Sequence, residues 1–230
     1  PYQVPMSEGN PFKDDAPPSW MTESIIRKNW DNYGPGSGQE PGGGYLGTSA
    51  EFCKTFPRVP RQIKTLKDYR KWIDGYDCGI YYADKHAGMI LDKLKDLGID
   101  GDTVVMISSD HGENQGELSV YGDHQTADHI TNRVPMIIYD PKGRIGKCKA
   151  DKSLHYQFDV AATLLELAGG NVPQTWDGKS FLGSLRKGRP EGRDYLVVSN
   201  CAWACQRAVR WDNYIMIKTY HSGYKNYPEI

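Results

Sequence analysis

The chain has 230 residues, with 28 basic and 29 acidic side chains and a formal net charge of −1 at pH 7. This balance argues against a general nucleic-acid binder, which usually carries a basic excess. No apolar stretch approaches the roughly 20 residues of a membrane-spanning helix, so no membrane span is expected. The length suits one large domain or a domain with an appendage.

Both ends of the sequence resemble interior positions of a longer chain. Pro1 stands where an initiator methionine would be, and Ile230 follows directly on a turn sequence. We therefore expect this chain to be the second part of a protein, with the missing N-terminal part as its partner.

Residues 1–60 are rich in chain breakers. Gly-Pro-Gly-Ser-Gly at 34–38 and Pro-Gly-Gly-Gly at 41–44 are not tolerated inside regular elements. One short helix is predicted at 22–29. We expect this part of the chain to be a loop-rich segment that covers a site or another domain.

The elements that follow alternate between helix and strand. Apolar residues at spacings of three and four predict a helix over 62–97 with Gly98 at its C-terminal cap, and a second helix over 157–168. Apolar runs predict strands at 103–109, 134–139 and 195–199, and residues 207–218 predict an antiparallel hairpin. A long polar loop is expected over 112–132.

The order helix, short turn, apolar strand is half of a parallel α/β unit. We therefore predict an α/β fold with a mostly parallel sheet flanked by helices and a small antiparallel C-terminal hairpin. Residues 61–185 would form the second part of the catalytic α/β domain, and residues 186–230 the start of a C-terminal subdomain.

The tip of the strand at 103–109 carries the first chemical signal. Asp110 and His111 follow the strand directly, and ligands bind at the carboxyl ends of strands in open α/β sheets. A carboxylate is a ligand for hard cations and an imidazole for a wider range of metals. The pair therefore predicts a metal site.

The polar loop adds two more imidazoles, His124 and His129. With His111, three of the six histidines fall within nineteen residues. Such side chains can bind an oxyanion, protonate a leaving oxygen or ligate a metal. A role for His124 is expected, whereas for His129 an ordinary loop residue is the competing interpretation.

Five motifs in order resemble the sulfatase family of the alkaline phosphatase superfamily. The resemblance runs from about Tyr69 to Tyr214. The motifs are Ser-Asp-His-Gly-Glu at 109–113, Arg-Val-Pro-Met-Ile-Ile at 133–138, the helix Asp-Val-Ala-Ala-Thr-Leu-Leu-Glu-Leu-Ala-Gly at 159–169, Asp-Gly-Lys-Ser at 177–180 and Arg-Ala-Val-Arg at 207–210.

This resemblance implies an alkaline phosphatase-like fold and hydrolysis of a sulfate ester. It implies a divalent cation, calcium first with zinc or manganese as alternatives, held in part by Asp110 and His111. The family has a sulfate-binding lysine eleven residues before the proline of the Arg-Val-Pro strand, and this chain has His124 there. His124 would bind the sulfate and protonate the leaving oxygen, and His129 would contact the substrate.

The nucleophile is the main departure from the family pattern. Sulfatases convert the first residue of Cys/Ser-x-Pro-x-Arg to formylglycine, and no such sequence occurs in these 230 residues. The resemblance therefore implies that the nucleophile lies outside this chain segment. It also favours a periplasmic or secreted location and a small-molecule or carbohydrate sulfate ester as substrate.

Three alternatives stay open at the level of sequence. The first is a phosphodiesterase or phosphonate monoester hydrolase of the same superfamily. The second is a two-zinc phosphatase-like hydrolase, because imidazole favours zinc over calcium. The third is a non-catalytic domain that keeps the fold without the nucleophile.

The five cysteines do not decide the redox compartment. Their number is odd and no Cys-x-x-Cys pair is present. Cys201 and Cys205 stand four residues apart, which leaves a disulfide open, and free buried thiols are the competing expectation.

Overall fold

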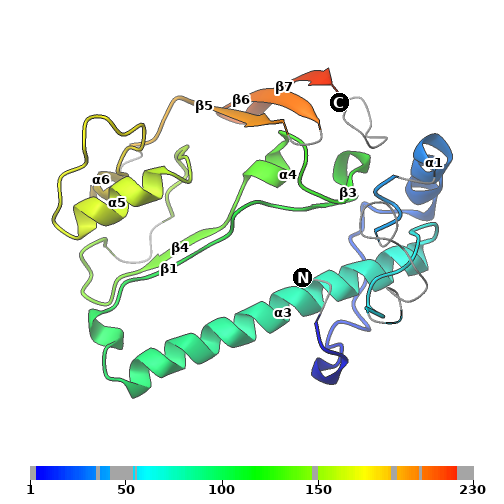
Figure 1. The fold of residues 1–230 in the computed structure, drawn as a ribbon, viewed down its shortest axis with the longest axis horizontal. Helices are drawn as coiled ribbons and strands as arrows, with labels where there is room; N and C mark the ends of the chain where they lie inside the picture. Colours follow the sequence, from blue (N-terminus) through cyan, green and yellow to red (C-terminus); the bar gives the residue numbers. More distant parts are fainter. Residues whose placement is uncertain are drawn as a thin grey trace.

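The computed structural model describes residues 4–34, 37–41, 54, 56–146, 150–187, 191–201 and 204–221. Figure 1 shows the long helix α3 (Leu66–Asp96) along one edge of the molecule, with the paired strands β1 (Val105–Ser108) and β4 (Met136–Tyr139) running in the middle of the view. The C-terminal strands lie at the opposite edge. Within the described residues, no helix is both long and apolar enough to cross a membrane.

The N-terminal segment packs against the beginning of α3. It contains a 3-10 turn, η1 (Met6–Glu8), and the helix α1 (Glu23–Tyr33), which Thr22 caps by accepting the N–H of Ile25. The helix predicted at 22–29 is therefore confirmed. The core of this region is a buried cluster that joins α1, α3 and β3 (Tyr121–Asp123); its members are Met21, Ile26, Ile63, Tyr69, Trp72 and Tyr121.

The helix predicted at 62–97 is confirmed as α3. Thr65 and Asp68 form a capping box at its start, in which each side chain accepts the backbone N–H of the other residue. The helix ends at Asp96 with Leu97 as its C-cap, and Gly98 then takes a φ of +67°, a left-handed conformation that suits glycine. The 3-10 turn η2 (Asp100–Asp102) leads from there into β1.

Strands β1 and β4 pair antiparallel, with Val105 opposite Tyr139 and Ser108 opposite Met136. All strand pairs within the described ranges are antiparallel, so the parallel part of the expected sheet is not among these strands. The helix predicted at 157–168 is α5 (Asp159–Leu167), and α6 (Leu182–Lys187) follows it.

The expected C-terminal hairpin is confirmed and extended to three strands. Strands β5 (Tyr195–Asn200), β6 (Cys205–Trp211) and β7 (Tyr214–His221) form one antiparallel sheet in that order. The β6–β7 turn contains Asp212 at a φ of +41°. Between β1 and β4, the region predicted as loop contains β2 (Asn114–Gln115), the 3-10 turn η3 (Glu117–Ser119), β3 and the short helix α4 (His129–Asn132).

Candidate functional site

The segment that follows β1 is held against α4. Gly112 donates its N–H to the carbonyl oxygen of Thr131 at 2.8 Å. A β-carbon on Gly112 would overlap the carbonyl oxygen of Ile130, so only glycine allows this close approach. The carbonyl oxygen of Ser109 accepts the side-chain amide of Gln157 at 2.8 Å. These contacts fix the backbone on both sides of Asp110 and His111.

Strand register brings Glu113 next to His124. Asn114 and Asp123 are cross-strand partners of β2 and β3, and the residues just outside this pair are Glu113 and His124. Directly opposed residues of antiparallel strands have neighbouring side chains. The His124 Nδ1 accordingly lies 3.1 Å from Oε2 of Glu113.

A buried carboxylate ties the two halves of the loop together. Asp128 is 2% exposed and caps α4 by accepting the N–H groups of Ile130 and Thr131 at 2.7 and 3.0 Å. Its other oxygen accepts the side-chain amide of Asn114 at 3.1 Å and the hydroxyl of Thr126. Asn114, which follows Glu113, and Thr126, which lies two residues after His124, are therefore joined through Asp128 in one buried hydrogen-bond network.

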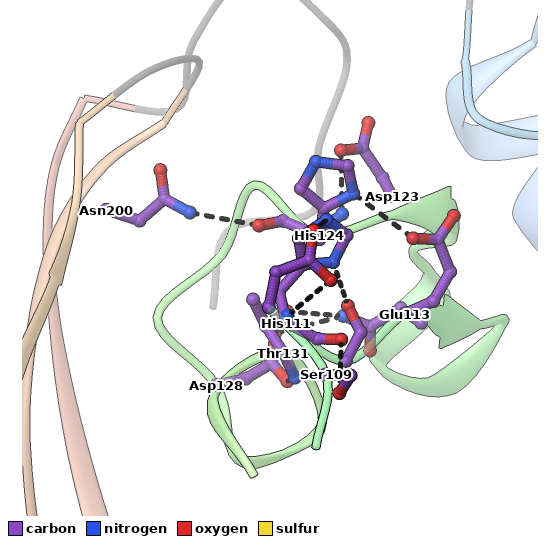
Figure 2. Close-up of polar contacts among 11 residues, drawn as sticks. Ser109, His111, Glu113, Asp123, His124, Asp128, Thr131 and Asn200 are labelled. Carbon is purple, nitrogen blue, oxygen red and sulfur yellow. Dashed lines mark hydrogen bonds and ion pairs between the residues drawn. The ribbon is translucent and has the colours of Figure 1, made fainter. Parts of the chain in front are cut away.

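His111 and His124 face each other across the site. Their rings are stacked, with centroids 3.7 Å apart and planes inclined by 20°. Figure 2 shows Glu113 reaching His124 from the side opposite Asn200, whose amide donates to the backbone carbonyl of His124 at 3.0 Å. One nitrogen or oxygen atom from each of His111, Glu113 and His124 lies within 4.8 Å of the others.

The orientation of the His111 ring suits a metal ligand. Its Nδ1 lies 2.8 Å from the carbonyl oxygen of Gly112, which can only accept, so Nδ1 carries a hydrogen and the neutral ring has its lone pair on Nε2. That Nε2 lies 3.6 Å from Oδ2 of Asp110. An imidazole nitrogen and a carboxylate oxygen at this distance can both be ligands of one cation.

The spacing agrees with two ligands of one ion. Ligand atoms about 2.4 Å from a calcium ion and at roughly right angles to each other would be about 3.4 Å apart. Asp110 and His111 therefore fit a divalent cation, and so does the group formed by His111, Glu113 and His124. His111 is common to both sets.

The stacked imidazoles impose a division of roles. The two rings have different partners, because Nδ1 of His111 faces the carbonyl oxygen of Gly112 and Nδ1 of His124 faces the Glu113 carboxylate. His111 suits the metal-binding role because its Nε2 is left for a ligand. His124 suits the role of a donor to a substrate oxygen because Glu113 orients its ring.

The two carboxylates differ in environment. The backbone N–H of His111 donates to Asp110 at 3.0 Å and lowers the pKa of that carboxyl. The Asp110 side chain is 86% exposed, whereas that of Glu113 is 15% exposed. Burial raises the pKa of Glu113, although the hydrogen bond with His124 works against this shift.

The structure brings together three of the four residues that the sequence singled out, Asp110, His111 and His124. His129 is the first residue of α4, outside the group of ligand atoms found among the described residues. Burial lowers its pKa, followed by the charges of Arg133 and Arg210. Glu113 was quoted within the 109–113 motif but given no role. Its position two residues after His111 was the sequence signal for a role of Glu113 in the site. The β2–β3 register then places Glu113 beside His124.

The sulfatase family model matches residues 38–170, which is more than half of the chain. The chain belongs to the sulfatase family. It is 26% identical over 202 residues to arylsulfatase K of Xenopus laevis, covering 81% of this chain and 35% of that protein. It is 31% identical over 115 residues to the multifunctional alkaline phosphatase superfamily protein PehA of Trinickia caryophylli, covering 49% of this chain and 22% of the relative.

Solved structures confirm the alkaline phosphatase-like fold of this sulfatase-family chain. A 2-O GAG sulfatase superimposes with a TM-score of 0.62 at 20% identity, covering 93% of this chain and 46% of that one. The phosphonate monoester hydrolase of Silicibacter pomeroyi superimposes with a TM-score of 0.59 at 19% identity, covering 87% and 40%. The chain thus spans less than half the length of these proteins. Membership of the family implies a divalent metal ion.

Proposed function

We propose that the protein is a sulfuric ester hydrolase and that this chain contributes part of its cation site and the general acid. The observation that carries the proposal is the group of donor atoms from His111, Glu113 and His124 within 4.8 Å of one another beyond the end of β1, with Asp110 beside His111. Membership of the sulfatase family indicates the class of reaction, and the donor atoms indicate where in this chain the cation would bind.

In this proposal, Asp110 and His111 hold the cation. When bound, the cation stabilises negative charge that grows on the sulfuryl oxygens. The carbonyl oxygen of Gly112 orients the His111 ring through Nδ1, so Nε2 is the nitrogen that would bind the cation. Removing that acceptor would release the ring to the other tautomer and weaken the site.

His124 is the proposed acid. Its Nδ1 faces the Glu113 carboxylate, so the ring is held in one orientation and Nε2 is left to carry a proton toward the departing alcohol oxygen. As a cation, it would also attract the sulfate anion. His129 is proposed to contact a more distant part of the substrate. Burial, and then the charges of Arg133 and Arg210, lower the pKa of His129.

The identity of the cation follows from which donors take part. A site built on Asp110 with further oxygen ligands would favour calcium. A site built on both imidazoles and Glu113 would favour zinc, and manganese lies between them in ligand preference. We propose calcium on the strength of the family resemblance, with His124 then left free to act as the acid.

The attacking group is not among these 230 residues, since the sequence contains no Cys/Ser-x-Pro-x-Arg. We therefore propose that formylglycine and the remaining cation ligands come from sequence beyond this chain segment. A small-molecule or carbohydrate sulfate ester is the proposed substrate. A relative named extracellular sulfatase SULF-1 homolog, from Drosophila melanogaster, supports a location outside the cytoplasm.

The test is hydrolysis by the intact protein of a sulfate ester against a phosphonate monoester and a phosphate diester. We expect the sulfate ester to be preferred. His124→Ala should lower kcat by about 10²- to 10⁴-fold, with larger losses for alkyl or sugar sulfates than for nitrophenyl sulfate, because poor leaving groups depend most on the acid.

His86→Ala is the matched control. His86 lies on α3 and its ring contacts the carbonyl oxygen of Tyr82, so this variant should keep the parent kcat. Preferred hydrolysis of the phosphonate would move the protein to the phosphorus-ester branch of the superfamily. Equal activities of the two variants would refute the assignment of His124.

A further inference from the structure

The end of the β5–β6 hairpin carries two thiols that the proposed reaction does not use. Cys201 and Cys205 have their Sγ atoms 3.7 Å apart. Cys201 is exposed and Cys205 is half-buried, so the expectation of buried free thiols is wrong for this pair, whereas Cys78 is buried as expected.

Strand register places this pair in suitable positions for a covalent bond. Asn200 and Gln206 are cross-strand partners of β5 and β6, and Cys201 and Cys205 are the next residues on each side. Directly opposed residues of antiparallel strands have Cα atoms about 4.5–5.5 Å apart. Disulfides need a Cα separation of about 4.4–6.8 Å, so side-chain rotation can close the sulfur–sulfur gap.

The residues that flank the cysteines hold the loop of the candidate site. Asn200 donates its side-chain amide to the carbonyl oxygen of His124 at 3.0 Å. Gln206 accepts the N–H of Ala127 at 2.8 Å and donates to the hydroxyl of Thr219 on β7 at 3.0 Å. Figure 2 shows Asn200 approaching His124 from the C-terminal sheet.

We propose that Cys201 and Cys205 form a reversible disulfide that locks the end of the β5–β6 hairpin and thereby restrains the loop that carries His124. The bond would fix the spacing of Asn200 and Gln206, which are its immediate neighbours on either strand. In the reduced protein the two thiols are in contact without a covalent bond. Oxidation therefore stiffens the connection between the C-terminal sheet and residues 124–127.

The oxidant is a low-molecular-weight disulfide such as oxidised glutathione. One cysteine loses its proton and attacks a sulfur of that disulfide, which forms a mixed disulfide and releases one small thiol. The second cysteine then attacks the protein-bound sulfur and releases the other small thiol. Two electrons pass to the small disulfide, and the two cysteine protons end on the two released thiols.

The sequence offers a clean assay for this bond. Trypsin should release residues 194–207 as one peptide that contains Cys201, Cys205 and no other cysteine. After equilibration of the intact protein with oxidised glutathione, we expect this peptide to lose the mass of two hydrogen atoms and to resist alkylation. Reduced glutathione should restore two alkylation sites. The peptide 72–85, with buried Cys78 alone, is the control.

The link to the candidate site is tested by hydrogen exchange. The amide of Ala127 should exchange several-fold more slowly in the oxidised protein than in the reduced protein, because Gln206 holds it more firmly. Cys201→Ser should remove this difference, and Cys205→Ser should do the same if the first variant folds poorly. These readouts need no ester hydrolysis, so they stand apart from the proposed enzyme activity.

Two results would overturn the proposal. The first is a 194–207 peptide that keeps both alkylation sites, or carries only glutathione adducts, under oxidising conditions. The second is formation of the bond with no change in exchange at Ala127, which would leave the disulfide without influence on the His124 loop.

Discussion

Asp128 should be the most sensitive position near the candidate site, although it lies outside the group of ligand atoms. In Asp128→Ala, α4 loses its cap, which costs about 1 kcal/mol. The buried hydroxyl of Thr126 also loses its acceptor, which costs about 1–3 kcal/mol. The amide of Asn114 keeps a second partner in Thr131 at 3.0 Å. We therefore expect a loss of about 3 kcal/mol in the free energy of unfolding.

Asp128→Asn should cost less, about 1–2 kcal/mol, because its remaining oxygen can still cap α4 while its NH₂ group faces the amide of Asn114. Asp92→Ala is the matched surface control. Its carboxylate is 73% exposed, and its one ion pair among the described residues is with Lys95, so the change should stay within about 0.5 kcal/mol.

The assay is urea unfolding of the three variants, followed by amide exchange at Ile130 and Thr131. The shift of the midpoint should follow the order Ala, Asn, surface control, and exchange at both amides should accelerate in Asp128→Ala. The kcat of the intact protein on a sulfate ester should fall as well, since Glu113 and the proposed acid His124 are positioned through this network. A cost for Asp128→Ala no greater than that of Asp92→Ala would refute the argument that the buried carboxylate holds the site together.

Three further predictions follow from the described contacts. The pKa of Asp151 is lowered from 3.8 to about 2, because hydrogen bonds from neighbouring serines outweigh its burial. Its contribution of about 1–2 kcal/mol to the free energy of unfolding is therefore complete at neutral pH and is lost as the pH falls from about 4 to about 2. Asp151→Asn should flatten this part of an acid-unfolding curve. Gly112→Ala should destabilise the protein by more than about 1 kcal/mol through overlap with Ile130, whereas Gly88→Ala, at an open position of α3, should stabilise it by about 0.5–1 kcal/mol in thermal unfolding. Removal of the cation by a chelator should lower the melting temperature, and His111→Ala should abolish that shift, whereas a shift of the same size in the variant would argue against the ligand role.

Local pattern was sufficient for the three longer helices α1, α3 and α5, whereas the short helices α4 and α6 were not predicted. The spacing of apolar residues over 62–97 reports one helix face, and Gly98 reports where the left-handed cap falls, because both depend on residues within one or two turns. The adjacency of Asp110 and His111 at the end of β1 is equally local, so their place in the candidate site could be predicted from the sequence, and their role as ligands stays a prediction. The role expected of His129 stays a prediction.

The remaining site residues depend on pairings that span longer stretches of chain. Glu113 meets His124 because Asn114 pairs with Asp123, and a register shift of one residue would turn these side chains away from each other. The antiparallel pairing of β1 with β4 was not expected either, since an apolar run reads the same in both orientations.

The amino-acid sequence by itself determined the family, the principal helices and the two neighbouring donors past β1, because each is written in consecutive or periodically spaced residues. Only the tertiary structure decided that His111 stacks on His124, that Glu113 joins them and that Cys201 faces Cys205. These contacts depend on strand register and on one buried carboxylate network, and neither leaves a periodic signal along the chain.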